Sequence, residues 1–151
     1  MAGIALGLAG GFFSYSLLLS DILEARAAHH RIECKKNMEM LIDSLQQYAF
    51  SHNGDLPARN DWKNALSPYL PTKTEVFFCP EETRKTESYV YLGDSGMKIT
   101  DELWTQGVPL IYESRVRHTR KCGNTLGVGF VDGKVKRIEK NDLESLIQNF
   151  K

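Results

Sequence analysis

Three cysteines are the side chains of this chain best suited to chemistry, and their spacing limits what they can do. Cys79 and Cys122 both lie in turn-like surroundings, and they could form a disulfide if this part of the chain sits in an oxidising compartment. Cys34 falls within a helical pattern, where a small packing residue is expected. Because no two cysteines have C-x-x-C spacing, the sequence indicates neither a zinc site nor a thiol-redox motif.

His118 lies in the basic run 115–121, and we consider it for a metal-binding or catalytic role. A metal-binding or catalytic histidine needs carboxylate or histidine partners, whereas the neighbours of His118 are cations. We therefore expect a structural or solvated histidine. The run itself could contact phosphate groups, but no aromatic side chains are interleaved with it. With a net charge of zero as well, we expect a solvated surface and no nucleic-acid partner.

One acidic loop has the oxygen ligands that calcium prefers. Asp94, Asp101 and Glu102 lie within nine residues of one another, and hard carboxylate oxygens are typical calcium ligands. Their spacing matches no EF-hand, and acidic loops are commonly hydrated without binding a metal. We therefore expect no metal site, with these three residues as the candidate for calcium.

Catalytic motifs are missing from the sequence. It contains no G-x-S-x-G and no H-E-x-x-H, and no nucleophile stands beside a base. We expect no catalytic residue, no cofactor and no small-molecule substrate. The chain is therefore predicted not to be an enzyme.

The first element that must position the rest is an uncharged N-terminus. Residues 1–20 carry no charged side chain, and 20 helical residues rise about 30 Å, which matches the hydrocarbon core of a bilayer. Their small residues suit close contacts between membrane helices. A cleaved signal peptide is an alternative, but no basic residue precedes the apolar run. A buried helix is a second alternative. We predict a transmembrane segment over 1–20.

The same helix is expected to continue to residue 53. No Pro or Gly occurs between Phe12 and Asn53, and apolar residues recur at three- and four-residue steps over 21–53. The residues of this stripe are Ile32, Met38, Leu41, Ile42, Leu45, Tyr48 and Ala49. Asn53-Gly54 provides a stop, because glycine accepts the left-handed conformation.

Residues 54–151 are expected to form one small α+β head. A brief helix capped by Asn60 or Asp61 carries Trp62 and Leu66. The predicted strands are 75–78, 88–92, 108–112 and a hairpin over 125–138. In the hairpin, Asp132-Gly133 fits a two-residue type I′ turn, and the glycines at 127 and 129 permit the backbone of another element to approach closely. Asn141 and Glu144 form a capping box for a last helix. The predicted fold class is α+β, with a long N-terminal helix packed on a small antiparallel sheet.

Several motifs in one order resemble a known family. The segment Arg31–Met38 followed by Leu45–Ala49 resembles the ARRIxCxNNLKQLxxAxxxYA region of pilin-like proteins. The later pieces are similar to N-G-x-(F/L)-P, L.PYL, F-x-C-P, S-Y-x-Y and RH…FADGHV, and in this chain they are Asn53–Pro57, Trp62–Leu70, Phe78–Pro80, Ser88–Tyr91, Arg117–His118 and Phe130–Val135. The last signature is that of the prepilin-type, processing-associated family, with His118, Asp132 and Gly133 as its motif residues.

The chain departs from this family in two places. Thirteen residues lie between His118 and Asp132, more than the family pattern usually has, so an insertion around 119–122 is expected and a fixed role for His118 is in doubt. Prepilins also carry a basic leader, a glycine at the cut and Phe-Thr-Leu-Ile-Glu before the span. Counting back from Cys34 places Met1 near the third residue of a mature pilin. Upstream DNA encoding that leader would favour assembly, and an upstream stop codon would favour a protein that does not assemble.

The resemblance implies a structural, non-enzymatic subunit of a bacterial type II secretion or type IV pilus-like system. Such a pseudopilin-like protein is anchored by one pass in the inner membrane, with its head in the periplasm or outside. Its partners would be membrane lipid and other pilin-like subunits, bound through the N-terminal helix. The basic residues after the span, taken alone, favour the opposite orientation. The alternative function is a membrane-tethered binding module with a pilin-like head that does not assemble.

Charge is divided unevenly along the chain. Residues 1–110 have a net charge of −4, and residues 111–151 have a net charge of +4. Opposite charges on two parts of one subunit would suit head-to-tail packing between copies.

Overall fold

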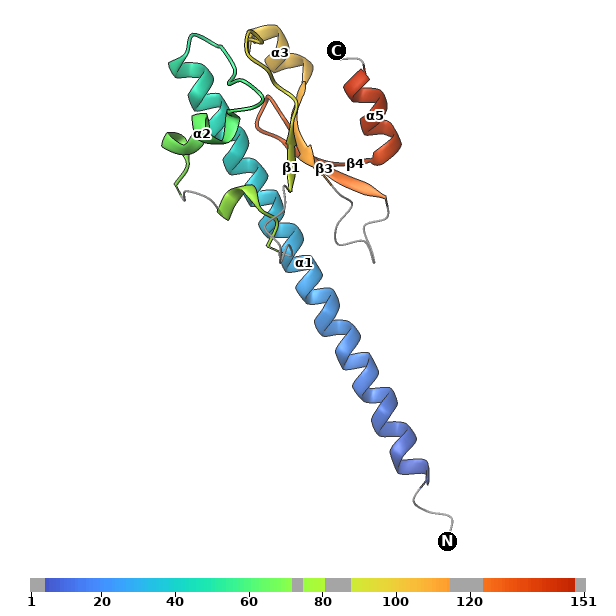
Figure 1. Cartoon of the computed structure of the whole chain (residues 1–151). Helices are drawn as coiled ribbons and strands as arrows, with labels where there is room; N and C mark the ends of the chain where they lie inside the picture. Colours follow the sequence, from blue (N-terminus) through green and yellow to red (C-terminus); the bar gives the residue numbers. More distant parts are fainter. Residues whose placement is uncertain (1–4, 72–74, 81–87, 115–123, 149–151) are drawn as a thin grey trace.

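One long helix runs from the N-terminal end of the molecule into the head, and the other elements lie around its C-terminal half (Figure 1). α1 comprises Ala5–Ser51, 47 residues, which is about 70 Å at 1.5 Å per residue. It ends where the sequence predicted. Asn53 and Gly54 have φ of +56° and +88°, and the amide of Gly54 donates to the carbonyl of Ala49 at 2.7 Å. This left-handed ending satisfies carbonyls that the helix leaves open.

This computed structural model describes residues 5–71, 75–80, 88–114 and 124–148, with side chains from Leu18 onward other than those at 101, 104 and 105. After α1 the elements are α2 (Trp62–Leu66), η1 (Ser67–Tyr69), η2 (Glu75–Phe77), β1 (Tyr89–Tyr91), α3 (Asp101–Gln106), β2 (Pro109–Glu113), β3 (Thr125–Phe130), β4 (Val135–Glu139) and α5 (Lys140–Gln148).

The four strands form one antiparallel sheet in the order β1-β2-β3-β4. β1 lies within the predicted strand 88–92, and β2 is one residue later than predicted. The register places Tyr89 opposite Glu113 and Gly127 opposite Arg137. The predicted α+β class, with a long N-terminal helix against a small antiparallel sheet, is therefore confirmed.

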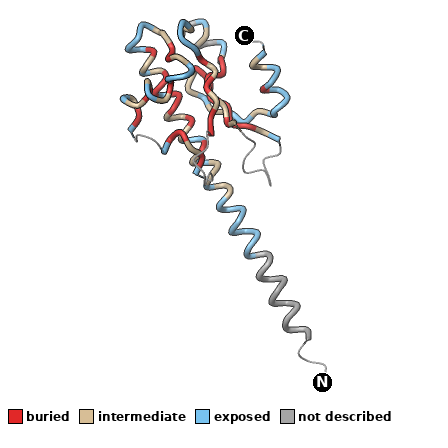
Figure 2. Tube along the Cα trace, in the orientation of Figure 1, coloured by how far each residue is buried: buried red, intermediate tan, exposed pale blue. Residues whose placement is uncertain are grey.

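The C-terminal half of α1 contributes one buried face to the centre of the hydrophobic core. Met38, Leu41, Ile42 and Leu45 are at most 1% exposed, as the predicted stripe requires. Ile32, predicted to belong to the same stripe, is 56% exposed, so that part of the prediction is wrong. Ile32 stands two residues before the buried Cys34, about 200° around the helix, so it lies on the face of α1 that points away from the head. Figure 2 shows that burial along α1 increases from the protruding part into the head.

The sheet is covered on both faces. Leu126, Val128 and Phe130 alternate onto the face that packs against Leu143 of α5. The glycines at 127 and 129 occupy the other face, against α1. A Cβ built on Gly129 would lie 2.8 Å from Ile111 Cγ2 and 3.0 Å from Ile42 Cγ1. The close approach predicted for these glycines is therefore present, but side-chain atoms fill the space, not another backbone.

The β3–β4 hairpin has a different turn from the one predicted. Gly133 has φ of +84°, whereas Asp132 is not among the residues with positive φ, so a type I′ turn is excluded. The amide of Gly133 donates to the carbonyl of Phe130 at 3.0 Å, and the amide of Phe130 donates to the carbonyl of Lys134 at 2.9 Å. These bonds define a three-residue loop, a type I turn followed by a glycine bulge. The extra residue places Val131, 1% exposed, in the core.

Three further elements differ from expectation. Residues 75–77, predicted as part of the strand 75–78, form the 3₁₀ turn η2. The consecutive residues Val76 and Phe77 are both buried, whereas consecutive side chains on a strand point to opposite faces. α3 was not predicted, although Thr100 caps it through a bond from the Leu103 amide and Gly107 ends it at φ +63°. α5 begins at Lys140, directly after β4, so the predicted cap residue Asn141 lies inside the helix.

Candidate functional site

Four large apolar side chains are exposed close together on the protruding half of α1, in a part of the helix that Figure 2 colours as exposed. Every residue from Leu18 to Arg26 is exposed. Leu18 and Ile22 are each 62% exposed, and Leu19 and Leu23 are each 46% exposed. Residues four apart on a helix share a face, so these four leucine and isoleucine side chains form two adjacent apolar rows. We call residues 18–26 the stem.

The expected transmembrane segment, residues 1–20, overlaps the stem only at its end. Residues 1–17 lie outside the residues whose side chains the structure describes. In the described part of the chain, no helix has a stretch both long enough and apolar enough to cross a membrane.

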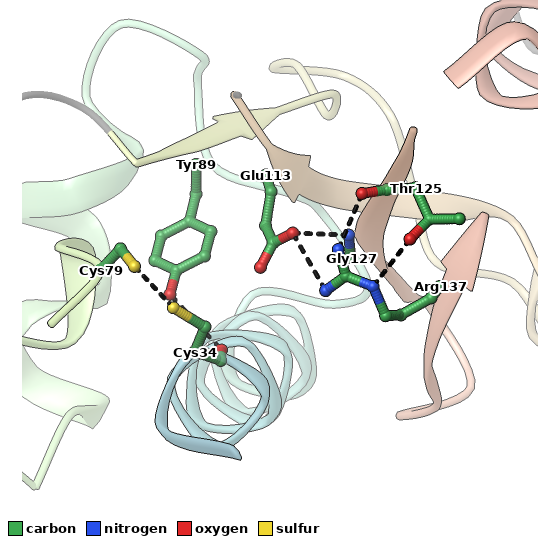
Figure 3. A network of polar contacts seen from close by, with 7 residues as sticks. All are labelled: Cys34, Cys79, Tyr89, Glu113, Thr125, Gly127 and Arg137. Carbon is green, nitrogen blue, oxygen red and sulfur yellow. Dashed lines mark hydrogen bonds and ion pairs between the residues drawn. The ribbon is translucent and has the colours of Figure 1, made fainter. Parts of the chain in front are cut away.

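A buried polar cluster lies where α1 enters the head (Figure 3). Cys34 comes from α1 and Cys79 from the segment after η2, and their Sγ atoms are 2.8 Å apart. The two residues are 1% and 2% exposed, and the structure holds both as reduced cysteines. The hydrogen bond with Cys79, together with burial, raises the pKa of the Cys34 thiol far above its usual range.

Tyr89 of β1 closes one side of this cluster. It is 3% exposed, and its hydroxyl donates to the carbonyl of Cys34 at 3.4 Å. Burial raises the pKa of the Tyr89 phenol well above its usual range, and negative charge on either cysteine would raise it further. Tyr89 thus stays neutral beside the thiols at physiological pH, while the nearby Glu113 carboxylate adds to the rise in the pKa of the Cys34 thiol.

Glu113 of β2 is the one charged side chain among the described residues that is fully buried, at 3% exposure. Its Oε2 accepts from the amide of Gly127 at 2.8 Å and from Arg137 Nη1 at 3.5 Å (Figure 3). Arg137 also donates to the hydroxyl and the carbonyl of Thr125, at 3.0 and 2.7 Å. A buried carboxylate requires such partners, and here they join β2, β3 and β4.

The expectation that Cys34 is a packing residue is confirmed, because it is 1% exposed, but sequence reasoning missed its contact with Cys79 and the burial of Glu113. Cys34 stands four residues before Met38, on the face of the helix that is buried. Glu113 stands two residues after Ile111 on a strand, so both side chains point to the same face. The bare face at Gly127 was the available sign that a larger side chain from a neighbouring strand would occupy that space.

Of the three residues that resemble a family motif (His118, Asp132 and Gly133), two are described, and their contacts are local. Asp132 Oδ1 accepts from the amide of Lys134 at 3.1 Å, and Oδ2 accepts from its ammonium at 2.6 Å. The hydrogen bond from Lys134 lowers the pKa of Asp132 below its usual value. Gly133 provides the left-handed bulge. Both residues therefore shape the hairpin, whereas His118 lies outside the described residues.

The other predicted sites are only partly described. Cys122 lies outside the described residues, so the possible Cys79–Cys122 disulfide stays a prediction. For calcium, Asp94 is exposed and its Oδ1 accepts from the Ser95 amide, while Glu102 accepts from Gln106 within α3. The described residues contain no group of three metal-ligating side chains, but the side chain of Asp101 is not among them.

A second exposed feature lies at the opposite end of α1. Phe50 is 92% exposed, and it lines an open groove with Gln47, Tyr69 and Ile99. The hydroxyls of Ser51 and Tyr69 meet there at 2.6 Å. An aromatic ring beside a rim of polar groups is suited to binding another molecule.

No protein-family model, curated protein or solved structure matched the chain.

Proposed function

We propose that this chain is a structural, non-enzymatic subunit of the pilin-like or pseudopilin-like kind, with a pilin-like fold. Residues 1–20 anchor it in the inner membrane by a single pass, and the head stands in the periplasm or outside. Neighbouring subunits associate through the N-terminal helix, as part of a secretion or type IV pilus-like system.

The observation that carries this proposal is the contrast between the two halves of α1. One face of the half from Cys34 to Ser51 is buried against the head, whereas the stem is exposed at every position and carries four large apolar side chains. Exposed apolar rows of this kind are unfavourable in water and are typical of interaction surfaces. Lipid on one side and a second helix on the other would cover the two rows.

A second support is that the motifs behind the family resemblance meet in space. Cys34 of the helix motif, Cys79 of F-x-C-P and Tyr89 of S-Y-x-Y form one buried cluster. Tyr91 of S-Y-x-Y donates to the carbonyl of Pro57, the last residue of N-G-x-(F/L)-P, at 3.2 Å. Contacts between motifs far apart in the sequence are expected if these motifs are the residues that pack together in one fold.

Photo-crosslinking in membranes tests assembly through the stem. A photo-reactive residue at Ile22 should yield adducts between copies of the chain, at multiples of 17.1 kDa. The same group at Glu144, exposed on α5, is the matched control and should yield few. A chain that is recovered in the membrane but gives only lipid adducts at Ile22 would contradict assembly.

That contradicting outcome would favour the second candidate, a membrane-tethered binding module. Phe50 is the observation in its favour, because a 92% exposed aromatic side chain on a groove far from the stem suits a partner of the head. Phe50→Ser should then abolish the interaction of the head while membrane attachment is unchanged.

A further inference from the structure

The contact between Cys34 and Cys79 is closer than packing alone requires. Non-bonded heavy atoms of carbon size sit about 3.5–4.0 Å apart at their optimum, whereas these two sulfurs are 2.8 Å apart. A disulfide bond measures about 2.05 Å, so closure needs the sulfurs to approach by less than about 1 Å. We propose that Cys34 and Cys79 form an intramolecular disulfide that fastens the long helix to the head.

The backbone on both sides of the pair is already fixed by other contacts. Asn37, one turn along α1, donates from its side chain to the carbonyl of Phe78 at 3.0 Å. The amide of Cys79 donates to the hydroxyl of Ser88 at 2.7 Å. These bonds hold the helix and the segment after η2 at the separation that the disulfide needs, so the bond forms without remodelling either element.

Metal binding by the same pair does not fit the geometry. Two thiolates on one tetrahedral zinc, each about 2.3 Å from the metal, lie roughly 3.8 Å apart. The sulfurs here are an ångström closer, and the described part of the chain offers no third ligand grouped with them. The pair is therefore arranged for a bond between the sulfurs.

The chemistry is thiol–disulfide exchange with a disulfide oxidant, either a small molecule such as glutathione disulfide or a protein oxidant. The thiolate of one cysteine attacks the oxidant to give a mixed disulfide and releases one thiol. The second cysteine then attacks the sulfur of the first and releases the other thiol. The pair loses two electrons and two protons, and the oxidant, reduced by two electrons, leaves as two thiols.

Burial determines when this exchange happens. The raised pKa of Cys34 keeps its thiol protonated in the folded head, and the thiolate is the reactive form. An oxidant must therefore meet the pair before α1 packs on the head, or during a local opening. Once formed, the bond is shielded from reductants for the same reason.

This inference is independent of the proposed membrane function, because the pair lies in the head and its oxidation can be followed in the purified full-length chain. The chain is unfolded in denaturant with reductant, then refolded in mild detergent with a mixture of reduced and oxidised glutathione. Remaining thiols are alkylated and the peptides are mapped by mass spectrometry. The same procedure on Cys122→Ser removes the third cysteine and is the matched control.

The expected result is one linked peptide pair joining Cys34 to Cys79, in both the natural chain and the Cys122→Ser variant, with Cys122 alkylated where it is present. In the reduced, folded chain, alkylation of Cys34 and Cys79 should be at least about 100-fold slower than in denaturant, because it requires opening. Recovery of both cysteines alkylated after oxidative refolding, or of either one linked to Cys122, would overturn the proposal. The mapping uses no substitution at the pair, so a failure of a variant to fold does not affect it.

Discussion

Adding one methyl group at Gly129 tests how closely α1 and β3 are packed. In Gly129→Ala the new Cβ would lie 2.8 Å from Ile111 Cγ2 and 3.0 Å from Ile42 Cγ1. Ile111 and Ile42 are both 0% exposed, and β-branched side chains have little rotamer freedom. Neither side chain can move aside, so β3 must shift away from α1.

The expected cost follows from overpacking a well-packed core, which is typically about 1–3 kcal/mol. The matched comparison is Gly127→Ala, two residues earlier on the same face of β3. There the nearest atoms are Met38 Sδ and Glu113 Cδ, both at 3.0 Å. The methionine side chain is flexible and can adapt, and at 3.0 Å the Glu113 carboxylate needs to move by only a few tenths of an ångström. We therefore expect Gly127→Ala to cost less, about 1 kcal/mol at most, at the low end of the same range.

Thermal unfolding of the full chain in mild detergent, followed by tryptophan fluorescence, measures the difference. Trp62 is 6% exposed and packs against Phe77 and Tyr91, so its emission reports on the head. For a head of about 100 residues, each kcal/mol corresponds to a Tm shift of roughly 4 °C or more. Equal Tm values for Gly129→Ala and the natural chain would refute close contact between α1 and β3.

Three further outcomes follow from the described contacts. Arg137→Ala should lower the unfolding free energy of the head by about 1–2 kcal/mol, as measured by denaturant titration. This is less than the cost of breaking a fully buried ion pair, because the arginine is a third exposed. Adding Glu113→Gln should recover part of the loss, because it removes the unpaired buried charge. The pKa of Asp132 is lowered, chiefly by its hydrogen bond with Lys134. The ionised carboxylate therefore stabilises the fold at pH values above 3.8, its ordinary pKa, and this stabilisation is lost as the pH falls through the lowered pKa. Asp132→Asn should therefore reduce the drop in Tm between neutral and strongly acidic pH, and an unchanged drop would contradict the assignment. Reduction of the proposed disulfide should lower the unfolding free energy by about 4 kcal/mol, the chain-entropy value for a loop of this length given a separation of 45 residues, as measured by paired denaturant titrations with and without reductant.

Local signals were sufficient for the parts of the fold that depend on neighbouring residues. The uninterrupted helical stretch and the Asn53-Gly54 stop predicted α1, and alternation in residues 125–130 predicted β3. The 3₁₀ turn at 75–77 was misread as a strand, because a short apolar run has no period that separates the two. The hairpin turn was misread because Val131 belongs to the core, which a dipeptide pattern does not reveal.

The candidate site depended on tertiary contacts and was therefore less accessible. Cys34 and Cys79 are 45 residues apart in the chain, and three cysteines permit three pairings, so sequence alone could not select this one. Ile32 was assigned to the apolar stripe, yet it lies about 180° around the helix from Leu41, so it is exposed while Leu41 is buried. Glu113 reads as an ordinary strand residue until its partners on β3 and β4 are seen.

We propose that residues 1–20 hold the chain in a membrane while the head remains folded outside it. Alkaline carbonate extraction of membranes from cells that express the full chain, followed by intact mass analysis, distinguishes an anchored chain from a released one. We expect the chain in the membrane pellet, released only by detergent, with residues 1–20 still attached. Recovery in the supernatant without detergent, or a mature mass lacking those residues, would contradict anchoring by residues 1–20.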